Sequence, residues 1–259
     1  LEWGLPLFRP SQTWTQIIEP RARITFMRNT DEEIFGLNND SAGTFLSDST
    51  LFSDNRFSGY DLWENGTFAD YGVRWSAYNN QDGDGTNVEI FLGQSYDFTN
   101  PETTDPNSGF HDGASDYVGR FSYNNNSWLD FATRFRLAQD NLSLRHMETS
   151  AHIGIGKNFL NLGHIWSQQF LDAQTMGDDI NEAVAGIGIQ LTNRWALRWD
   201  AIFNMTSGEF QRHTGGLFYE HPCYYLSVQY RRDNAIKEDY VGTTTFQFRF
   251  GMSIDGQRY

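Results

Sequence analysis

Hydrophobic and polar residues alternate with a period of two along most of the chain, whereas helical periodicity is nearly absent. Successive side chains of a β-strand point to opposite faces, so this pattern predicts amphipathic strands. The clearest example is SWLDFATRFRLA at 127–138, and RWALRWDAIF at 194–203 and TTTFQFRFGM at 243–252 repeat it. One face of these strands is apolar and carries Leu129, Phe131, Phe135, Trp195, Leu197, Trp199, Phe246, Phe248 and Phe250.

The opposite face of the same strands is polar and includes Arg134, Arg136, Arg198, Asp200, Gln247 and Arg249. A face with this many charges is not the inner layer of a dry β-sandwich, because unpaired charges are costly to bury. We therefore expect the polar set to face a wet lumen and the apolar set to face lipid.

The alternation predicts about thirteen strands, and their connections divide by parity into short turns and long loops. The expected strands lie at about 1–8, 12–28, 67–78, 87–98, 116–123, 127–138, 143–155, 158–170, 181–191, 194–206, 209–220, 223–233 and 241–253. The long loops, at about 29–66, 99–115, 171–180 and 234–240, all fall at one end of the strands. This arrangement predicts an all-β fold, an antiparallel up-and-down transmembrane β-barrel.

Aromatic residues near the strand ends are expected to form interfacial girdles, namely Trp75, Tyr96, Tyr117, Trp128, Trp166, Trp195 and Tyr225. A soluble β-sandwich or a large lipocalin-like barrel is the alternative. It is less favoured, because such sheets rarely keep Arg and Asp along one face of so many long strands.

Composition narrows the function. The 259 residues carry a net charge of -14, which argues against a nucleic-acid partner because phosphate neutralisation needs clustered Lys and Arg. No window approaches the ~20 apolar residues of a helical membrane span.

The chain begins at Leu1 without an initiator Met, so we expect a piece of a longer protein. Its lone cysteine, Cys223, is either a small buried hydrophobe or the partner of a cysteine elsewhere.

Motifs of catalysis and metal binding are incomplete. QDGDGTN at 81–87 resembles the start of a calcium loop, but Gly93 stands where the bidentate Glu is required. IGIGKN at 153–158 lacks the spacing of a phosphate-binding loop, and the six histidines are scattered singly. With G-x-S-x-G absent as well, we expect no enzyme activity, no metal and no cofactor.

Several ordered segments resemble the LptD family, outer-membrane proteins that insert lipopolysaccharide into the outer leaflet. The segments are TQIIEPRARITF, LFSDNRFSGYDLWENGTFADYGVRW, VEIFLGQSYDF, SDYVGRFSY, HPCYYLSVQYRR and TTTFQFRF. The resemblance covers essentially the whole chain. It implies that Arg56, Gly59, Tyr60, Asp61, Glu64 and Gly66 form a loop-and-strand signature of the family.

That family joins a periplasmic jellyroll to a barrel of about 26 strands. The resemblance implies that 1–259 is one domain, the C-terminal part of that barrel, in the outer membrane of a Gram-negative bacterium. It implies as partners an LptE-type lipoprotein plug, periplasmic lipopolysaccharide-bridge proteins that bind the missing N-terminal domain, outer-membrane lipid and lipopolysaccharide.

The resemblance also implies two local roles. Cys223 would form a disulfide with the periplasmic domain, although Pro222 stands where some members carry a second adjacent cysteine. Residues 241–253 would form one side of a lateral gate, with Gly242, Thr243, Thr245, Gln247, Arg249 and Gly251 as its residues. A passive porin or solute channel is the alternative function, since it would share the fold, loops and girdles.

Overall fold

The computed structural model describes residues 1–27, 45–56, 64–81, 85–99, 107–169, 178–234, 242–254 and 257–258. Regular structure in these residues consists of strands alone. The described part of the chain therefore contains no candidate for a membrane-spanning helix. Of the expected signature, Gly59, Tyr60 and Asp61 lie outside the described residues.

The strands agree closely with the alternation. They are β1 Glu2–Gly4, β2 Leu7–Arg9, β3 Trp14–Met27, β4 Gly66–Asn79, β5 Asn87–Asp97, β6 Tyr117–Asn124, β7 Leu129–Leu137, β8 Leu144–Ile155, β9 Asn158–Ser167, β10 Ile180–Gln190, β11 Trp195–Asn204, β12 Glu209–His221, β13 Tyr224–Asp233, β14 Thr243–Ile254 and β15 Gln257–Arg258. The expected strand at about 1–8 is two short pieces, which both pair with β3. Pro6 lies between them and cannot donate a ladder hydrogen bond.

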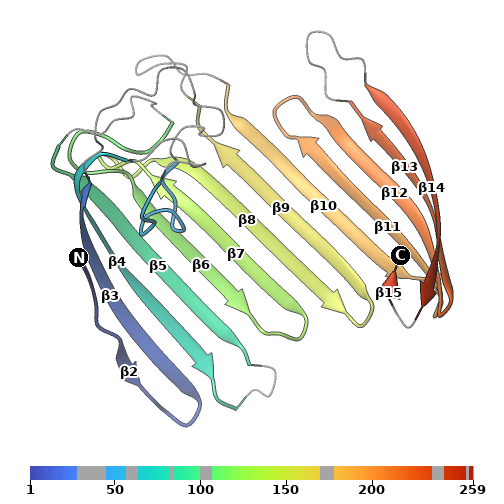
Figure 1. The fold of residues 1–259 in the computed structure, drawn as a ribbon, viewed down its shortest axis with the longest axis horizontal. Coiled ribbons are helices and arrows are strands. Elements are labelled where there is room, and N and C mark those ends of the chain that lie inside the picture. The colour runs from blue at the N-terminus through green and yellow to red at the C-terminus, as the bar shows by residue number, and fades with distance from the viewer. Residues whose placement is uncertain are drawn as a thin grey trace. The chain divides into compact units, whose positions relative to one another are not determined.

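From β3 to β14, neighbours in sequence are also neighbours in the sheet (Figure 1). The strand pairs whose register the structure defines are antiparallel, as expected when short turns join consecutive strands. The fold is therefore all-β, antiparallel and up-and-down, and it is consistent with half of a β-barrel.

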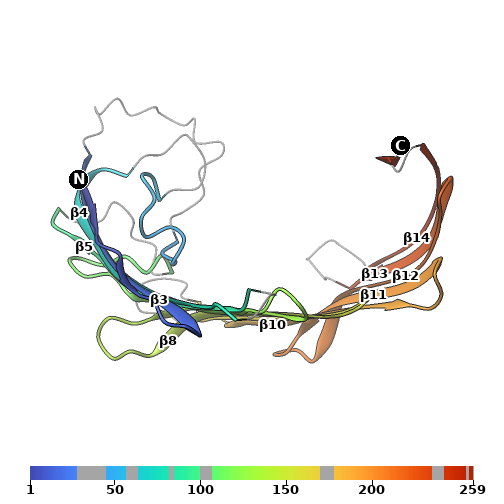
Figure 2. The ribbon, with the colours of Figure 1, turned by 90° about the horizontal axis from the view of Figure 1, so that it is seen from below.

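The chain divides into two compact units. Unit 1 comprises 1–126, 132–148 and 166–180, and unit 2 comprises 127–131, 149–165 and 181–259. Unit 1 has a small apolar core, made by Leu46, Leu51, Phe110 and Val118, which lies between the sheet and the segments that cover it. Figure 2 shows the segment after residue 45 on one side of β4 and β5.

Aromatic rings pack against glycines of adjacent strands in both units. A Cβ on Gly119 would overlap the ring of Phe135, and one on Gly188 would overlap the ring of Phe159. These glycines therefore leave room for a ring against the backbone, which is the packing that compensates a strand for a missing side chain.

One aromatic residue differs from expectation. Tyr225 does not join the residues of the apolar face, because its ring lies over Gly251 on the same face as Glu220. Its neighbour Tyr224 occupies the apolar face instead, in ring contact with Tyr219 and Phe250. The two tyrosines are adjacent in sequence, so alternation between strand faces allows only one of them to point outward.

Candidate functional site

The candidate site of unit 1 is the polar face of β3 to β7 together with the segment 45–56. In the sheet register, Arg23 lies opposite Asp70, and Asp70 lies opposite Ser95. Period-two alternation places all three side chains on one face of the sheet. The apolar residues Ile24, Tyr71 and Tyr96 point to the other face, where each is more than a third exposed.

Apolar side chains attach the segment 45–56 to this polar face. Leu46 and Leu51 are fully buried, and they pack with Val118 of β6. Gly93 lies directly beneath Leu51, since a Cβ at that position would overlap the leucine side chain. Burying a leucine stabilises a fold by about 1.5–3 kcal/mol, so these two side chains hold the segment in place.

Arg23 connects β3 to this segment. Its guanidinium donates hydrogen bonds to the carbonyl oxygens of Phe52 and Ser53, each at 2.6 Å, and to Oδ2 of Asp70 at 2.9 Å. Carbonyls of an irregular segment need donors when they are covered, and Arg23 supplies them. The side chain of Arg23 thereby fixes the backbone of 52–53 over the sheet.

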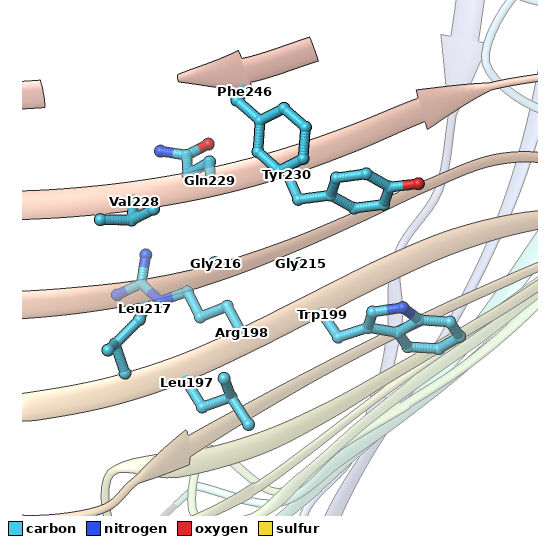
Figure 3. A pocket seen from close by; sticks show the side chains of 10 residues that line it. All are labelled: Leu197, Arg198, Trp199, Gly215, Gly216, Leu217, Val228, Gln229, Tyr230 and Phe246. Carbon is cyan, nitrogen blue, oxygen red and sulfur yellow. The ribbon is translucent and has the colours of Figure 1, made fainter. Parts of the chain in front are cut away.

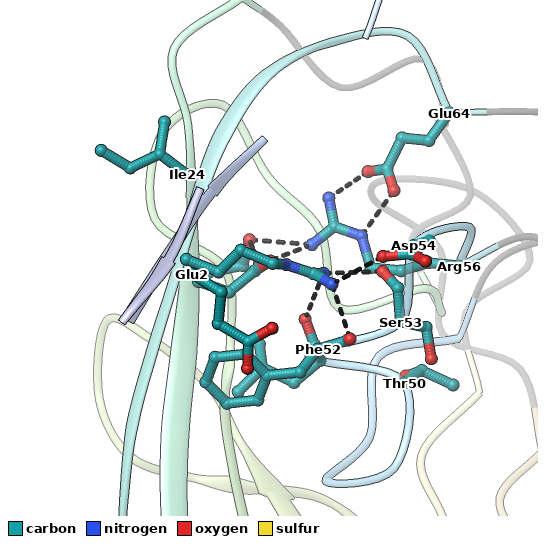
Figure 4. Close-up of polar contacts among 12 residues, drawn as sticks. Glu2, Ile24, Thr50, Phe52, Ser53, Asp54, Arg56 and Glu64 are labelled. Carbon is teal, nitrogen blue, oxygen red and sulfur yellow. Dashed lines mark hydrogen bonds and ion pairs between the residues drawn. The ribbon is translucent and has the colours of Figure 1, made fainter. Parts of the chain in front are cut away.

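Arg56 connects the segment to β4 and β5. Its Nε donates to Oε2 of Glu64 at 2.6 Å, and Figure 4 shows the two-pronged contact between these side chains. Nη1 donates to Oδ1 of Asp70 at 3.2 Å and to the hydroxyl of Ser95 at 2.8 Å. The guanidinium also stacks with two rings, 4.1 Å from the centre of Phe68 and 4.4 Å from that of Phe110.

Asp70 is the centre of this arrangement, with no exposed surface. It accepts hydrogen bonds from both arginines and from Ser95, whose hydroxyl lies at 2.7 Å. A buried carboxylate with two cationic donors is stable only as long as all partners stay in place. The network therefore fixes the docked position of 45–56 more strictly than apolar packing alone would.

Two carboxyl groups of the covering segments have shifted pKa values. Burial raises the pKa of Glu64 above its ordinary value, although the hydrogen bond from Arg56 acts in the opposite direction. Burial likewise raises the pKa of Asp48, against the attraction of Arg134 and Arg120. Desolvation thus outweighs pairing at both positions.

Four predicted residues, Arg56, Glu64, Arg134 and Arg136, meet in this region. Arg134 lies 3.5 Å from Asp48, and Arg136 lies 3.4 Å from Asp116, with its guanidinium 4.5 Å from the ring centre of Phe45. Glu64 belongs to the same face through Arg56. Sequence reasoning placed Arg56 and Glu64 by resemblance alone and missed Arg23 and Asp70. The sequence feature that could have identified Arg23 and Asp70 is a charged residue within a strand, on the polar side of the alternation.

The remaining predicted residues lie in unit 2. Arg198 and Asp200 share the polar side of β11, and Arg198 lies 4.8 Å from the ring centre of Phe218. Gln247 and Arg249 lie in β14, opposite Gln229 and Ser227. Cys223 is an exposed free thiol at the turn between β12 and β13, so it is not a buried packing residue.

The apolar side of unit 2 is bounded by aromatic residues at both ends of its strands. Trp195 packs against Tyr219 at one end of β11, and Phe203 packs against Phe210 at the other. The eight steps from Trp195 to Phe203 span about 26 Å, at about 3.3 Å per residue. Because strands of membrane barrels tilt by about 35–45°, this length covers about 20 Å of the apolar band, which is about 25 Å tall.

Comparison with known proteins identifies the family. The model of LPS transport system D, LptD, matches residues 1–195 of this chain. The chain belongs to the LptD family. It is similar to the LPS-assembly protein LptD of Acinetobacter baylyi, with 24% identity over 234 residues. That match covers 88% of this chain and 27% of the relative, so the chain spans about a quarter of the length of its curated relative.

Proposed function

We propose that this chain forms part of the outer-membrane translocon that inserts lipopolysaccharide into the outer leaflet of a Gram-negative bacterium. Lipopolysaccharide has a polar saccharide part and apolar acyl chains, so its carrier needs a wet path and an opening toward lipid. The observation that carries the proposal is the apolar band of unit 2, which is bounded by aromatic pairs at both ends of its strands. LptD family membership supports the choice of lipopolysaccharide as the cargo.

In this proposal the polar faces of the two units line the lumen. Arg134 and Arg136 of unit 1 and Arg198 and Asp200 of unit 2 face the saccharide path. The docked segment 45–56 narrows the part of that path that unit 1 contributes. No covalent chemistry, metal or cofactor enters the proposed mechanism.

The strand β14 forms one side of the proposed lateral gate. It pairs with β13 from Tyr224↔Met252 to Asp233↔Thr243, and in the described residues its other edge pairs only through Ser253 and Ile254, with β15. All side chains from Thr243 to Phe250 are exposed. The free backbone edge of β14 can accept a strand from the rest of the barrel, and separating those two strands would open a path to lipid.

The partners follow from the same proposal. An LptE-type lipoprotein plugs the lumen, and periplasmic bridge proteins deliver lipopolysaccharide to an N-terminal domain of the full-length protein. Cys223 forms a disulfide with that domain, and its exposure at a strand-connecting turn is compatible with an external partner.

A seam crosslink in the full-length protein tests the gate. A cysteine replacing Thr245, paired with a cysteine in the first strand of the complete barrel, should block lipopolysaccharide delivery to the cell surface when oxidised. Reduction should restore delivery, and the heat-dependent gel mobility of the barrel should be unchanged in both states. Normal delivery through a verified crosslink would refute the gate, and a passive porin would show no crosslink between lipopolysaccharide and the seam.

A further inference from the structure

The apolar side of unit 2 contains a shallow depression of about 660 Å³. Its floor is Gly215, which lies between Trp199 and Tyr230 in the cross-strand register, with Phe246 next in the same row (Figure 3). A Cβ on Gly215 would meet only the Trp199 ring, at 3.7 Å. The missing side chain therefore creates the hollow, and the aromatic rings form its walls.

The depression extends along the strands toward the middle of the apolar band. The adjacent row consists of Leu197, Leu217 and Val228, and all three line the hollow. Each is exposed by 37–43%. The depression is open to its surroundings, and its lining is almost free of polar atoms.

The row on the opposite side of the aromatic walls is cationic. His213 pairs with Arg232, two residues beyond Gly215 and Tyr230, toward the long-loop end of the strands. Arg232 donates to the Thr244 hydroxyl and to Oδ1 of Asn234, each at 2.8 Å, which holds its guanidinium at the strand end. Nδ1 of His213 is buried and makes no hydrogen bond within the described part of the chain.

We propose that this depression binds one acyl chain of lipopolysaccharide, with a phosphate of its lipid anchor at Arg232 and His213. This inference rests on the proposed function, since it requires the apolar side of unit 2 to face the membrane. Long loops of outer-membrane barrels are extracellular, so this row lies near the extracellular end of the apolar band, just inside the Phe203–Phe210 pair. From there the long side chain of Arg232 can reach the outer-leaflet headgroups. An acyl chain entering beside Arg232 then runs past Tyr230 and Phe246 toward Val228.

Hydrophobicity alone cannot produce this preference, because the surrounding lipid tails are as apolar as the depression. The preference comes from close packing of the chain in the hollow and from charge-assisted hydrogen bonds to phosphate. Outer-leaflet lipopolysaccharide carries both groups, acyl chains and phosphates, in one molecule. The depression adjoins β14, so a lipid that leaves the proposed gate meets it within the first strands.

Photocrosslinking in cells that make the full-length protein and its partners tests the proposal. A photoreactive phenylalanine analogue at Leu217 should crosslink to lipopolysaccharide. The crosslinked product is detected on gels with an antibody against lipopolysaccharide. The same analogue at Ile187, an apolar-face residue outside the depression with similar exposure, 38% against 37%, should crosslink about tenfold less, which corresponds to about 1.4 kcal/mol.

Two substitutions sharpen the test. Gly215→Leu fills the hollow and Arg232→Gln removes the cation, and each should reduce the Leu217 crosslink by about tenfold. Arg231→Gln is the matched control, because Arg231 lies next in sequence but on the polar face, paired with Asp233. Heat-dependent gel mobility establishes that each variant is folded, and Arg232→Gln decides the question if Gly215→Leu does not fold.

Equal crosslinking at Leu217 and Ile187 would overturn the inference, as would crosslinks to phospholipid in place of lipopolysaccharide. Surface delivery of lipopolysaccharide, measured in the same cells, separates the two levels of the argument. Normal delivery without a Leu217 crosslink would refute the acyl-chain site but not the proposed translocon function. If lipopolysaccharide crosslinks to no position of the barrel, including the seam, both the acyl-chain site and the translocon function would be refuted.

Discussion

The polar faces of the two units are built from the same alternation but are covered to different extents. In unit 1, Asp70 is fully buried and Arg23 is 6% exposed, because the segment 45–56 packs over them. In unit 2, Arg198 and Asp200 are exposed at equivalent mid-strand positions. A charged residue on a strand thus predicts a polar face, but a covering segment decides whether that charge contacts water.

This difference in burial changes how much each charge contributes to the stability of the fold. An exposed ion pair is screened by water and contributes about 0–1 kcal/mol, whereas removing one partner of a buried pair costs several times more. We therefore expect the docked segment of unit 1 to respond sharply to substitution, and the polar face of unit 2 to tolerate it. Four experiments test that comparison.

The largest effect is expected for Asp70→Asn. It leaves the buried Arg23 and Arg56 without a shared counter-charge, and the barrel should lose about 3–5 kcal/mol of unfolding free energy. Asp200→Asn in unit 2 is the control and should change stability by less than about 1 kcal/mol. Urea unfolding in lipid vesicles measures both, and equal losses would contradict the comparison.

Leu51→Ala should cost about 2–4 kcal/mol, because it leaves a cavity between the segment and the sheet. Limited proteolysis should then cut within 45–56 while the strands stay intact. Leu197→Ala is the control, since Leu197 is 43% exposed on the apolar side of unit 2. Unchanged protection of 45–56 in Leu51→Ala would show that the arginines alone hold the segment.

Gly93→Ala tests the close approach of Leu51 to the sheet. The added methyl would overlap Leu51 and lie 2.9 Å from the Tyr71 carbonyl oxygen, so we expect a loss of about 1–3 kcal/mol. Gly215→Ala has no such neighbour and should be close to neutral. Thermal unfolding of the two variants, followed by gel mobility, compares them, and a tolerated Gly93→Ala would place Leu51 farther from the strand.

The smallest effect is the pH dependence of the docked segment. Because burial raises the pKa of Glu64 and of Asp48, the folded protein holds these protons up to a higher pH than the unfolded chain does. Docking should therefore gain stability as pH falls from neutral toward about 4, and lose it as pH rises through the raised values. Protease protection of 45–56 that weakens between pH 7 and pH 5 would contradict this sign.

Alternation predicted the strands well because it depends only on local geometry. From β3 onward each expected strand coincides with an observed one, with ends that differ by a few residues. The division into faces follows from the same period, so the positions of Arg134 and Phe135 on opposite sides were readable from sequence. Tyr225 was assigned to the wrong side, although counting back by two from Val228 and Leu226 places Tyr224 on the apolar face.

The bulge in β12 shows a second limit of local reasoning. Ile202 pairs with Arg212 but Phe203 pairs with Phe210, so one extra residue shifts the register. The shift returns Phe210 to the apolar side, where it contacts Trp199 and Phe203. Strict alternation would have placed it beside Arg212, because nothing in the sequence marks an inserted residue.

The sequence by itself determined the strands, their polar and apolar sides and the family resemblance, since each depends on spacing along the chain. Only the tertiary structure decided that Arg23 and Asp70, 47 residues apart, share one buried network with Arg56. It also decided that the hollow at Gly215 lies two residues along the strand from the row of Arg232. This arrangement depends on the register of β11 to β14. Contacts across strands depend on register and on where loops fold back, and period-two alternation is the same for every register that shifts by two residues.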